Sequence, residues 1–570
     1  MAFNNERKPG LKQRALKRLT AALVVSLGHF AIDSYAEKTP IDLLLHNGTV
    51  FTGADAIEPV SAIAVHHGKI IALGDHSLIN LYQPNKKIDL GCRFIMPGFN
   101  DSHLHLEGQS SRYIDLNKVT SVSEIMRLVT AKAENLGDGE WITGYGWSED
   151  ALAEGRKPTK TDLDIAAPNN PVVLTRAGAH SAVASSAALK LAGITAASPN
   201  PEGGVFEKNA AGKLTGIIRE RHGLVTSLVP PPSDAEIQAS LKTQVRALFE
   251  LGITSYTNAS TDPRELAQFA GIYSDGSTLP RGSLQLLWQG DNTLALYRDF
   301  ASQEPSRLRL GAVKIFADGG FTGPAAFTTK PYKGEATYRG SLNMPKSELQ
   351  NAISVAHGAG LQLGVHAIGD AAIDLAADLI AAALESTPRD DHRHYLNHFS
   401  MMPSTATMQK MGRMGIAISQ QPNFTYTLEG RYNAYLDGKR LQHNNPLRSP
   451  MDNGIRLAIS SDILPLDPIV GIYAAVTRRG MSGAVYGIAE ALSVSEALKA
   501  YTAEAAYLNF RETELGFIAP GYRADMVVLS DNPTTMNPDQ LLELSVAHTF
   551  FNGELVYSSS SQQPTQCLTN

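Results

Sequence analysis

Apolar runs of six or seven residues recur through the middle of the chain, and segments with apolar residues three and four apart lie between most of them. The runs are expected to be buried strands and the segments amphipathic helices. Strands that alternate with helices are typical of βα units around a parallel sheet. Eight such units predict an α/β fold with a (β/α)8 TIM-like barrel. The expected strands are 94–100, 253–258, 283–288, 312–317, 361–366, 394–399, 416–421 and 456–462.

Two of the expected helices have clear ends in the sequence. The helix over 235–251 follows Ser233 and Asp234, which are residue types that cap helix N-termini. The helix over 345–359 ends before Gly360, and glycine is the preferred residue just after a helix. These signals support the assignment of helices between the barrel strands.

Short strands with tight turns stand at both ends of the chain. Near the N-terminus, Asn47-Gly48 and His67-Gly68 have the residue types of two-residue hairpin turns. The strand–turn–strand pattern returns after residue 525. Because an isolated hairpin is marginally stable in water, we expect both ends to pair into one β-sandwich beside the barrel. The expected bounds are 37–95 and 516–560 for the sandwich and 96–515 for the barrel.

The segment from about 110 to 232 is too long for a loop between the first two barrel strands. It contains its own strand and helix patterns, so we expect an inserted α/β lobe over the mouth of the barrel. Trp147 ends the run G-Y-G-W, and with Arg176 and His180 it is a candidate for contact with substrate. The alternatives are burial of Trp147 in the lobe core and a hydrogen bond of His180 within the lobe.

Composition and charge exclude some classes of function. The chain has 570 residues and a formal net charge of −6, and no basic block is long enough to indicate nucleic-acid binding. The hydrophobic fraction of 43% is enough to build a full core, as in ordinary soluble enzymes. The two cysteines, Cys92 and Cys567, do not have the spacing of metal ligands.

The N-terminal segment has the order of a secretory signal peptide. A basic stretch precedes a short apolar run over 21–32, and Ser34 and Ala36 are small residues at the positions that a signal peptidase reads. The pattern predicts a signal peptide over 1–36 and export to the periplasm, without stable membrane association after cleavage. The alternative is a cytoplasmic protein with a loose basic tail. At the other end, residues 561–570 are expected to be disordered.

Side chains that bind metals stand at the ends of the expected barrel strands, where barrel enzymes place their active residues. His103 and His105 are two residues apart, so on a strand their imidazoles would point to the same side. Each residue alone has an ordinary explanation, such as a buried hydrogen bond, a lysine amine that reaches solvent, or a helix cap. Together they form a ligand set for one or two divalent ions. The candidate ligands are His103, His105, Lys314, His366, His398 and Asp462.

Several motifs include these residues or lie elsewhere along the chain. The motifs are D-S-H-L-H from Asp101, G-Y-G-W from Gly144, the stretch from Arg176 to His180, V-K-I-F-A-D-G from Val313, H-A-I-G-D from His366, R-H-Y-L-N-H from Arg393, S-S-D-I-L-P-L-D-P from Ser460 and P-G-Y-R-A-D from Pro520. They resemble the amidohydrolase superfamily and, within it, the branch of the N-substituted formamide deformylases (amidohydrolase family 3). The resemblance covers nearly all of the chain from Ile41 to Tyr557. It implies a metal-dependent hydrolase with a barrel, a flanking sandwich and one or two Zn²⁺ ions, and it implies that Lys314 is carboxylated to bridge two ions.

The chain departs from this branch at three positions. Asn397 stands where a glutamate usually precedes the sixth-strand histidine, Ser460 stands where a glycine is usual, and Ser185 stands where an asparagine is common. None of these changes removes a candidate ligand. They change groups around the ligands, and such groups can alter metal affinity or activity substantially.

The resemblance implies hydrolysis of a non-peptide C–N bond, and the ligand set suggests how. A divalent ion lowers the pKa of a bound water toward ~7, so Asp462 can take its proton as it attacks a carbonyl and return the proton to the leaving nitrogen. The ion, or His180, would polarise the carbonyl oxygen.

The expected partner is a small-molecule substrate: an N-substituted formamide, an N-acyl amine or a cyclic amide. The alternatives are an ester or carbamate hydrolase on the same centre and a catalytically silent binding protein of the same fold. A homodimer is one candidate for the oligomeric state.

Overall fold

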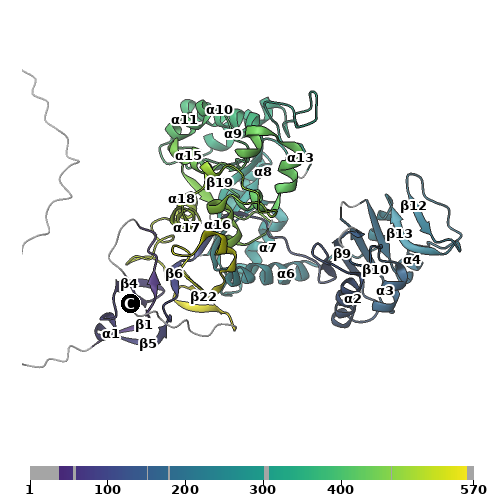
Figure 1. Ribbon diagram of the computed structural model, residues 1–570, viewed down its shortest axis with the longest axis horizontal. Coiled ribbons are helices and arrows are strands. Elements are labelled where there is room, and N and C mark those ends of the chain that lie inside the picture. Colours follow the sequence, from purple (N-terminus) through teal and green to yellow (C-terminus); the bar gives the residue numbers. More distant parts are fainter. Residues whose placement is uncertain are drawn as a thin grey trace, which may run out of the picture.

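The computed structural model describes residues 38–54, 60–149, 152–177, 180–300, 307–321, 323–463 and 465–560. The expected signal peptide (1–36) and the expected disordered tail (561–570) lie outside these residues. The described chain has three parts: a parallel barrel, a β-sandwich built from both ends of the chain, and an inserted α/β lobe (Figure 1). This arrangement confirms the expected fold class. Among the described residues, no helix is long and apolar enough to cross a membrane.

Eight parallel strands form the barrel and follow each other around it in the order of the sequence. The first and last strands meet where Leu104 and Asp462 form a parallel bridge, so the sheet is nearly closed. The strands are β7 (Phe99–Leu104), β14 (Ile253–Thr261), β15 (Arg281–Leu287), β16 (Leu308–Phe316), β17 (Leu363–Ala367), β18 (Tyr395–His398), β19 (Ala417–Gln420) and β20 (Leu457–Ile459).

Helices follow most of these strands, and the two expected from their end signals are present. In α6, Ser233 Oγ accepts the Glu236 N–H at 3.2 Å and the Glu236 carboxylate accepts the Ser233 N–H at 3.1 Å. A cap of this kind typically stabilises a helix by ~1 kcal/mol. The helices of this part are α6 (Asp234–Ala247), α7 (Pro263–Ser274), α8 (Asp291–Phe300), α9 (Lys346–Gly358), α10 (Asp370–Ser386), α11 (Thr405–Met414), α12 (Asn423–Thr427), α13 (Glu429–Tyr435), α14 (Gly438–Gln442), α15 (Arg448–Asp452), α16 (Pro468–Thr477), α17 (Val494–Ala500) and α18 (Ala503–Leu508).

The sandwich consists of a four-stranded sheet from the N-terminal end and a five-stranded sheet that joins both ends of the chain. In the second sheet, β6 runs antiparallel to β21, with Met96 opposite Val527. Apolar side chains of both sheets, such as Val65 and Val528, form one buried cluster between them. The strands are β1 (Thr39–His46), β3 (Ala62–His66), β4 (Lys69–Gly74) and β5 (Tyr82–Asp89) in the first sheet, and β2 (Thr49–Val50), β6 (Phe94–Pro97), β21 (Met526–Leu529), β22 (Val546–Phe551) and β23 (Glu554–Ser558) in the second.

The first expected barrel strand, 94–100, is in fact divided between two sheets. The chain leaves the sandwich after β6 at Pro97 and enters the barrel as β7 at Phe99. Gly98 allows the change because a Cβ at this position would lie only 2.2 Å from Thr254 Oγ1 on β14. Pro97 has no N–H for a ladder hydrogen bond, which favours the end of a strand here. As a result, His103 lies inside β7 rather than after it.

The inserted lobe has a six-stranded sheet whose two faces are both covered within the lobe. Leu174 and Trp147 pack in the cluster under α2 and α3, whereas Val173 faces the opposite cluster under α4 and α5. The elements are β8 (Tyr113–Asp115), α2 (Val122–Leu136), β9 (Ile142–Trp147), α3 (Lys160–Ala166), β10 (Val172–Arg176), β11 (Ser181–Ala184), α4 (Ser186–Leu191), β12 (Val205–Lys208), β13 (Leu214–Arg219) and α5 (Gly223–Thr226).

The lobe lies to one side of the barrel, beyond α6, and not over the barrel mouth as expected from the sequence (Figure 1). Its start is tied to α6, where Gln109 N–H donates to Ser240 Oγ at 3.1 Å and Ser111 Oγ donates to Glu236 at 2.5 Å. Because the lobe buries both faces of its sheet by itself, it needs no apolar contact with the barrel for its own core.

Candidate metal centre

Four imidazoles meet at the carboxyl end of the barrel. His103 belongs to β7, His105 follows that strand, His366 belongs to β17, and His398 ends β18. The ring centroids of His103 and His398 are 4.8 Å apart, and those of His366 and His398 are 4.4 Å apart. Three of the rings are buried and His105 is partly exposed. The parallel strands therefore bring together histidines that are far apart in the sequence.

Two hydrogen bonds fix how the buried rings are presented. His103 Nδ1–H donates to Asn397 Oδ1 at 2.7 Å, and His398 Nδ1–H donates to Gln421 Oε1 at 2.8 Å. A neutral ring that donates from Nδ1 keeps an unshared electron pair on Nε2. In His103 this Nε2 lies 3.4 Å from Lys314 Nζ.

Asn397 belongs to a short chain of buried amides inside the barrel. Its Nδ2 donates to Gln285 Oε1 at 3.4 Å, and Gln285 Nε2 donates to the Tyr395 hydroxyl at 2.8 Å. Gly364 on β17 leaves room for this chain, because a Cβ there would lie 2.8 Å from Gln285 Oε1. We call Asn397, Gln285 and Tyr395 the amide relay. It holds the His103 ring through neutral groups.

Lys314 and Asp462 are two of the ionisable side chains that lie among these imidazoles. Asp462 Oδ1 lies 3.5 Å from His105 Nε2, and its Oδ2 lies 3.7 Å from His398 Nδ1. Burial raises the pKa of Asp462 and lowers the pKa of Lys314, and the attraction between the two opposes both effects. Together, the six residues selected from the sequence lie in one continuous group.

The imidazoles are neutral at ordinary pH. Burial is the main cause that lowers the pKa of His103, His366 and His398 well below the usual value, and it lowers the pKa of His105 to about 4. Neutral imidazole is the form that binds metals. Both ring nitrogens of His366 are buried and make no hydrogen bond, which is costly for polar atoms unless another partner occupies the site.

The ligand atoms of this group, with their unshared electron pairs, fit a divalent cation. His103, His105 and Asp462 offer ligand atoms that all lie within 4.8 Å of one another. Imidazole nitrogen and carboxylate oxygen are ordinary zinc ligands. The unbonded nitrogens of His366 add further donors beside His398.

The backbone of two residues of this group lies in the left-handed region. His398 has φ of 77° and Asp462 has φ of 58°, which is uncommon for residues other than glycine, although Asp and His adopt it more often than most. The Asp462 N–H donates to the His103 carbonyl at 2.8 Å, and the Phe399 N–H donates to the Ala367 carbonyl at 3.0 Å. These bonds hold the two segments, and uncommon backbone conformations that are held in this way concentrate at functional sites.

A mostly apolar cavity of about 160 Å³ lies next to three of these residues, His366, His398 and Asp462. A cavity of this size can hold a group about as large as benzene. Its apolar walls are Phe321, Ile368, Phe424, Leu428, Tyr432 and Ile463.

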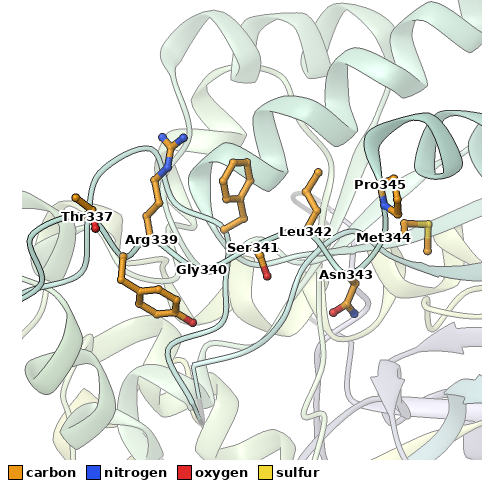
Figure 2. Close-up of a pocket in the computed structure, with 10 residues that line it drawn as sticks. Thr337, Arg339, Gly340, Ser341, Leu342, Asn343, Met344 and Pro345 are labelled. Atoms are coloured by element: carbon orange, nitrogen blue, oxygen red, sulfur yellow. The ribbon is translucent and has the colours of Figure 1, made fainter.

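A wider hollow of about 740 Å³ lies along the loop 337–345, with Phe327 at its side. Arg339 points away from Asn343 across this loop, and none of the six residues of the candidate centre lines the hollow (Figure 2). The smaller cavity is therefore the better candidate for the site of chemistry.

The lobe residues selected from the sequence are not part of this group. Trp147 is fully buried, with its indole N–H donating to the Leu174 carbonyl at 3.0 Å, so it fills the lobe core instead of facing substrate. Arg176 Nε donates to Glu149 at 2.7 Å, and the largely exposed His180 pairs with Glu220 at 3.1 Å. All three residues have partners within the lobe. The lobe lies beside the barrel, so these residues do not reach the candidate metal centre.

Two buried carboxylates support the centre and were not selected as site residues from the sequence. Asp318 accepts the N–H groups of Ile368 and Gly369 at 3.0 and 2.9 Å, which holds the segment after His366. Asp101 accepts the N–H of Ser461 at 3.1 Å and so ties β7 to the segment after β20. Burial raises the pKa of each to about 7. Asp318 lies two residues after the end of β16, and Asp101 lies inside β7, two residues before His103. Their closeness to the candidate ligands in the sequence was the signal that could have found them.

The fold and the site define a metal-dependent hydrolase. Residues 86–557 match the sequence model of the amidohydrolase family, so the chain belongs to this family. As a member it is a hydrolase that acts on carbon–nitrogen bonds.

Known proteins of similar length support this assignment. The chain is 30% identical to YtcJ of Bacillus subtilis (strain 168), named as an amidohydrolase, over 533 residues that cover 90% of this chain and 99% of the relative. It is 28% identical to the N-substituted formamide deformylase of Arthrobacter pascens, with 90% of this chain and 98% of the relative covered. A solved metal-dependent hydrolase of Pyrococcus furiosus superposes with a TM-score of 0.66 and 27% identity, covering 86% of this chain and 100% of that one.

Proposed function

We propose that the chain hydrolyses the C–N bond of a small amide, such as an N-substituted formamide, an N-acyl amine or a cyclic amide. The observation that carries this proposal is the group of neutral, buried imidazoles with Asp462 beside a small apolar cavity. The similarity to an N-substituted formamide deformylase over nearly the whole chain supports the same substrate class.

One or two Zn²⁺ ions would be held by the six residues at the strand ends. Lys314 as an ammonium would donate to His103 Nε2, only 3.4 Å away, and so would compete with a cation for that nitrogen. Reaction of its neutral amine with CO₂ forms a carbamate and releases a proton, which replaces the competing donor with two acceptor oxygens. A cation in this site supplies Lewis acidity, which activates water and polarises a carbonyl.

Asp462 would move the proton. Its carboxylate accepts a proton from water as the water oxygen bonds to the carbonyl carbon, and it gives that proton to the nitrogen as the C–N bond breaks. Burial raises the pKa of Asp462, which suits a group that must both accept and donate a proton. The products are a carboxylic acid, or formate, and an amine, and a cyclic amide opens to a single amino acid.

The apolar cavity would bind the substituent of the substrate. Phe321, Phe424 and Tyr432 present aromatic surface beside His366 and His398. Apolar surface buried there contributes about 25 cal/mol per Å², and it also keeps bulk water away from the reacting carbonyl.

The test is a panel of matched substrates on chelated protein that is reloaded with Zn²⁺. N-Benzylformamide, N-acetylbenzylamine and a cyclic amide represent the amides, and benzyl formate and a carbamate represent the alternatives. We expect metal-dependent release of amine, faster for benzyl than for a charged substituent of similar length. Turnover of the ester or carbamate without the amides would contradict the proposal, and so would no turnover at full metal loading.

A further inference from the structure

A second group of metal-binding side chains lies on the sandwich, at the turn between β3 and β4. Leu43 pairs with Val65 in antiparallel register, so Asp42 and His66 are the next cross-strand pair and share a face of the sheet. His67 follows as the first residue of a two-residue turn. Within the described chain, only this group and the candidate metal centre bring at least three such ligand atoms within 4.8 Å of one another.

The turn itself directs His67 toward the pair. His67 and Gly68 have φ of 50° and 72°, as a type I′ turn requires. The His67 N–H donates to Asp42 Oδ2 at 2.6 Å, and the ring centroids of His66 and His67 are 3.8 Å apart. Two adjacent histidines therefore lie on the same side of the sheet edge, beside one carboxylate.

The spacing of Asp42 and His66 is that of two ligands around one ion. Asp42 Oδ1 and His66 Nδ1 are 3.3 Å apart, and this Nδ1 makes no hydrogen bond. Ligands that lie ~2.0–2.1 Å from a tetrahedral ion are separated from each other by ~3.3 Å. The His67 N–H occupies Oδ2, so Oδ1 is the carboxylate oxygen that faces the histidine.

Two cationic side chains lie near this group. Lys69 is the cross-strand partner of His66, and Arg523 is bridged to Lys69 through the backbone. Arg523 is paired with Glu514 at 2.8 Å, whereas the ion pair recorded for Asp42 in the described chain is with His66. The carboxylate is therefore not neutralised by either cation.

We propose that Asp42, His66 and His67 form a second, surface site for a transition metal, independent of the barrel centre. Two imidazole nitrogens and one carboxylate oxygen suit Zn²⁺, Ni²⁺ or Cu²⁺, with water as the remaining ligand. The ion would join β1 to the β3–β4 hairpin and stabilise the first sheet of the sandwich by binding only the folded form.

The test counts ions on the full chain. Chelated wild type and the double variant His66→Gln/His67→Gln are titrated with Zn²⁺ and with Ni²⁺, and bound metal is measured by calorimetry and elemental analysis. We expect the wild type to bind one more ion per chain than the double variant, with equal amide turnover in both. His76→Gln is the matched control, since it removes an exposed histidine of the sandwich that lies outside the group.

A milder variant separates loss of the site from loss of the fold. Asp42→Asn keeps an acceptor for the His67 N–H but removes the charge, so it should fold normally and bind the additional ion more weakly. Added Ni²⁺ should raise the melting temperature of the wild type and not that of the double variant. The same number of ions, bound equally tightly, in wild type and double variant would overturn the proposal and leave Asp42 and His66 as an ordinary ion pair.

Discussion

Two groups of buried histidines lie at opposite ends of the barrel, and β18 connects them. At the carboxyl end, His398 closes β18 and faces the other residues of the candidate metal centre. At the amino end of the same strand, His394 and His392 precede Tyr395, and His357 from α9 packs against them. The two groups have the same residue type and similar burial, so the difference between them lies in their partners.

At the amino end every ring nitrogen has a hydrogen bond. His394 Nδ1 accepts the Leu363 N–H at 3.0 Å, and its Nε2–H donates to His357 Nδ1 at 2.8 Å. His357 Nε2–H then donates to the Thr387 carbonyl at 2.8 Å. His392 is held in the same way between two backbone groups.

At the carboxyl end, in the described part of the chain, some of the histidine ring nitrogens have no hydrogen bond. His366 makes no hydrogen bond, and His103 keeps its Nε2 toward Lys314. Histidines whose nitrogens are all filled by the protein stabilise the fold, whereas those that keep buried lone pairs can bind a ligand. The comparison also follows the general division of barrels into a stability face and a catalytic face.

The largest expected effect on the function of the carboxyl end comes from removing its base. Asp462→Asn keeps the size of the side chain and removes the proton acceptor. We expect kcat to fall by at least ~10²-fold, the low end of general acid–base contributions, while most bound metal is retained. Steady-state kinetics and elemental analysis on the same preparation measure both quantities.

His103→Ala is the contrasting variant for this experiment. It removes a candidate ligand and not the base, so metal content should fall together with activity. Near-normal turnover of Asp462→Asn at full metal loading would mean that another group moves the proton.

A smaller effect is expected from the amide relay, which supports His103 without touching substrate. Asn397→Leu removes the acceptor of the His103 Nδ1–H, so the ring loses its fixed tautomer. Metal affinity should weaken by ~10- to 100-fold, as measured by competition with a chromogenic chelator.

Asn397→Asp is the control, because a carboxylate still accepts the Nδ1–H and should restore most of the affinity. If Asn397→Leu bound metal as tightly as the wild type, the relay would have only a packing role.

The smallest effect concerns stability at the amino end. Burial, with smaller contributions from His392, Arg389 and His357, lowers the pKa of His394 to about 2 from the ordinary 6.5. Between these values the unfolded chain binds the extra proton and the folded chain does not, so stability is complete above pH 6.5 and falls as the pH decreases. At pH 5 the loss from His394 is about 2 kcal/mol. Urea unfolding at pH 8 and pH 5 measures it.

His394→Leu should change both the stability at pH 8 and the dependence of stability on pH. The variant leaves the Leu363 N–H and His357 Nδ1 without a partner, which costs about 1–3 kcal/mol for each buried group. It should therefore be less stable at pH 8 but lose less on acidification, with unchanged metal content. An equal pH dependence in both proteins would show that His394 does not contribute to it.

Much of the fold could be predicted because most barrel strands are short, largely apolar runs separated by helix patterns. The pattern also located His366, His398 and Asp462, since strand ends of a parallel barrel converge. The division at Pro97-Gly98 was harder to predict, because β6 and β7 are both apolar and only the approach of Thr254 shows where the chain changes sheets.

The remaining differences depend on contacts that leave no local pattern. The amide relay needs Gln285, Tyr395 and Asn397 from two strands, and their meeting depends on closure of the barrel. Trp147 has the same neighbours in sequence whether it faces substrate or the lobe core, so only the packing of β9 against α2 decides the question.

The pairing of β6 with β21 also determines when the sandwich can assemble during protein synthesis. Met96 leaves the ribosome long before its partner Val527, which comes much later in the chain. The strand that leads directly into β7 and His103 therefore has one edge open until β21 has been synthesised. Chaperones that shield open strand edges are expected to matter most during this interval, because long-range pairing of this kind is slow and exposes the nascent chain to aggregation.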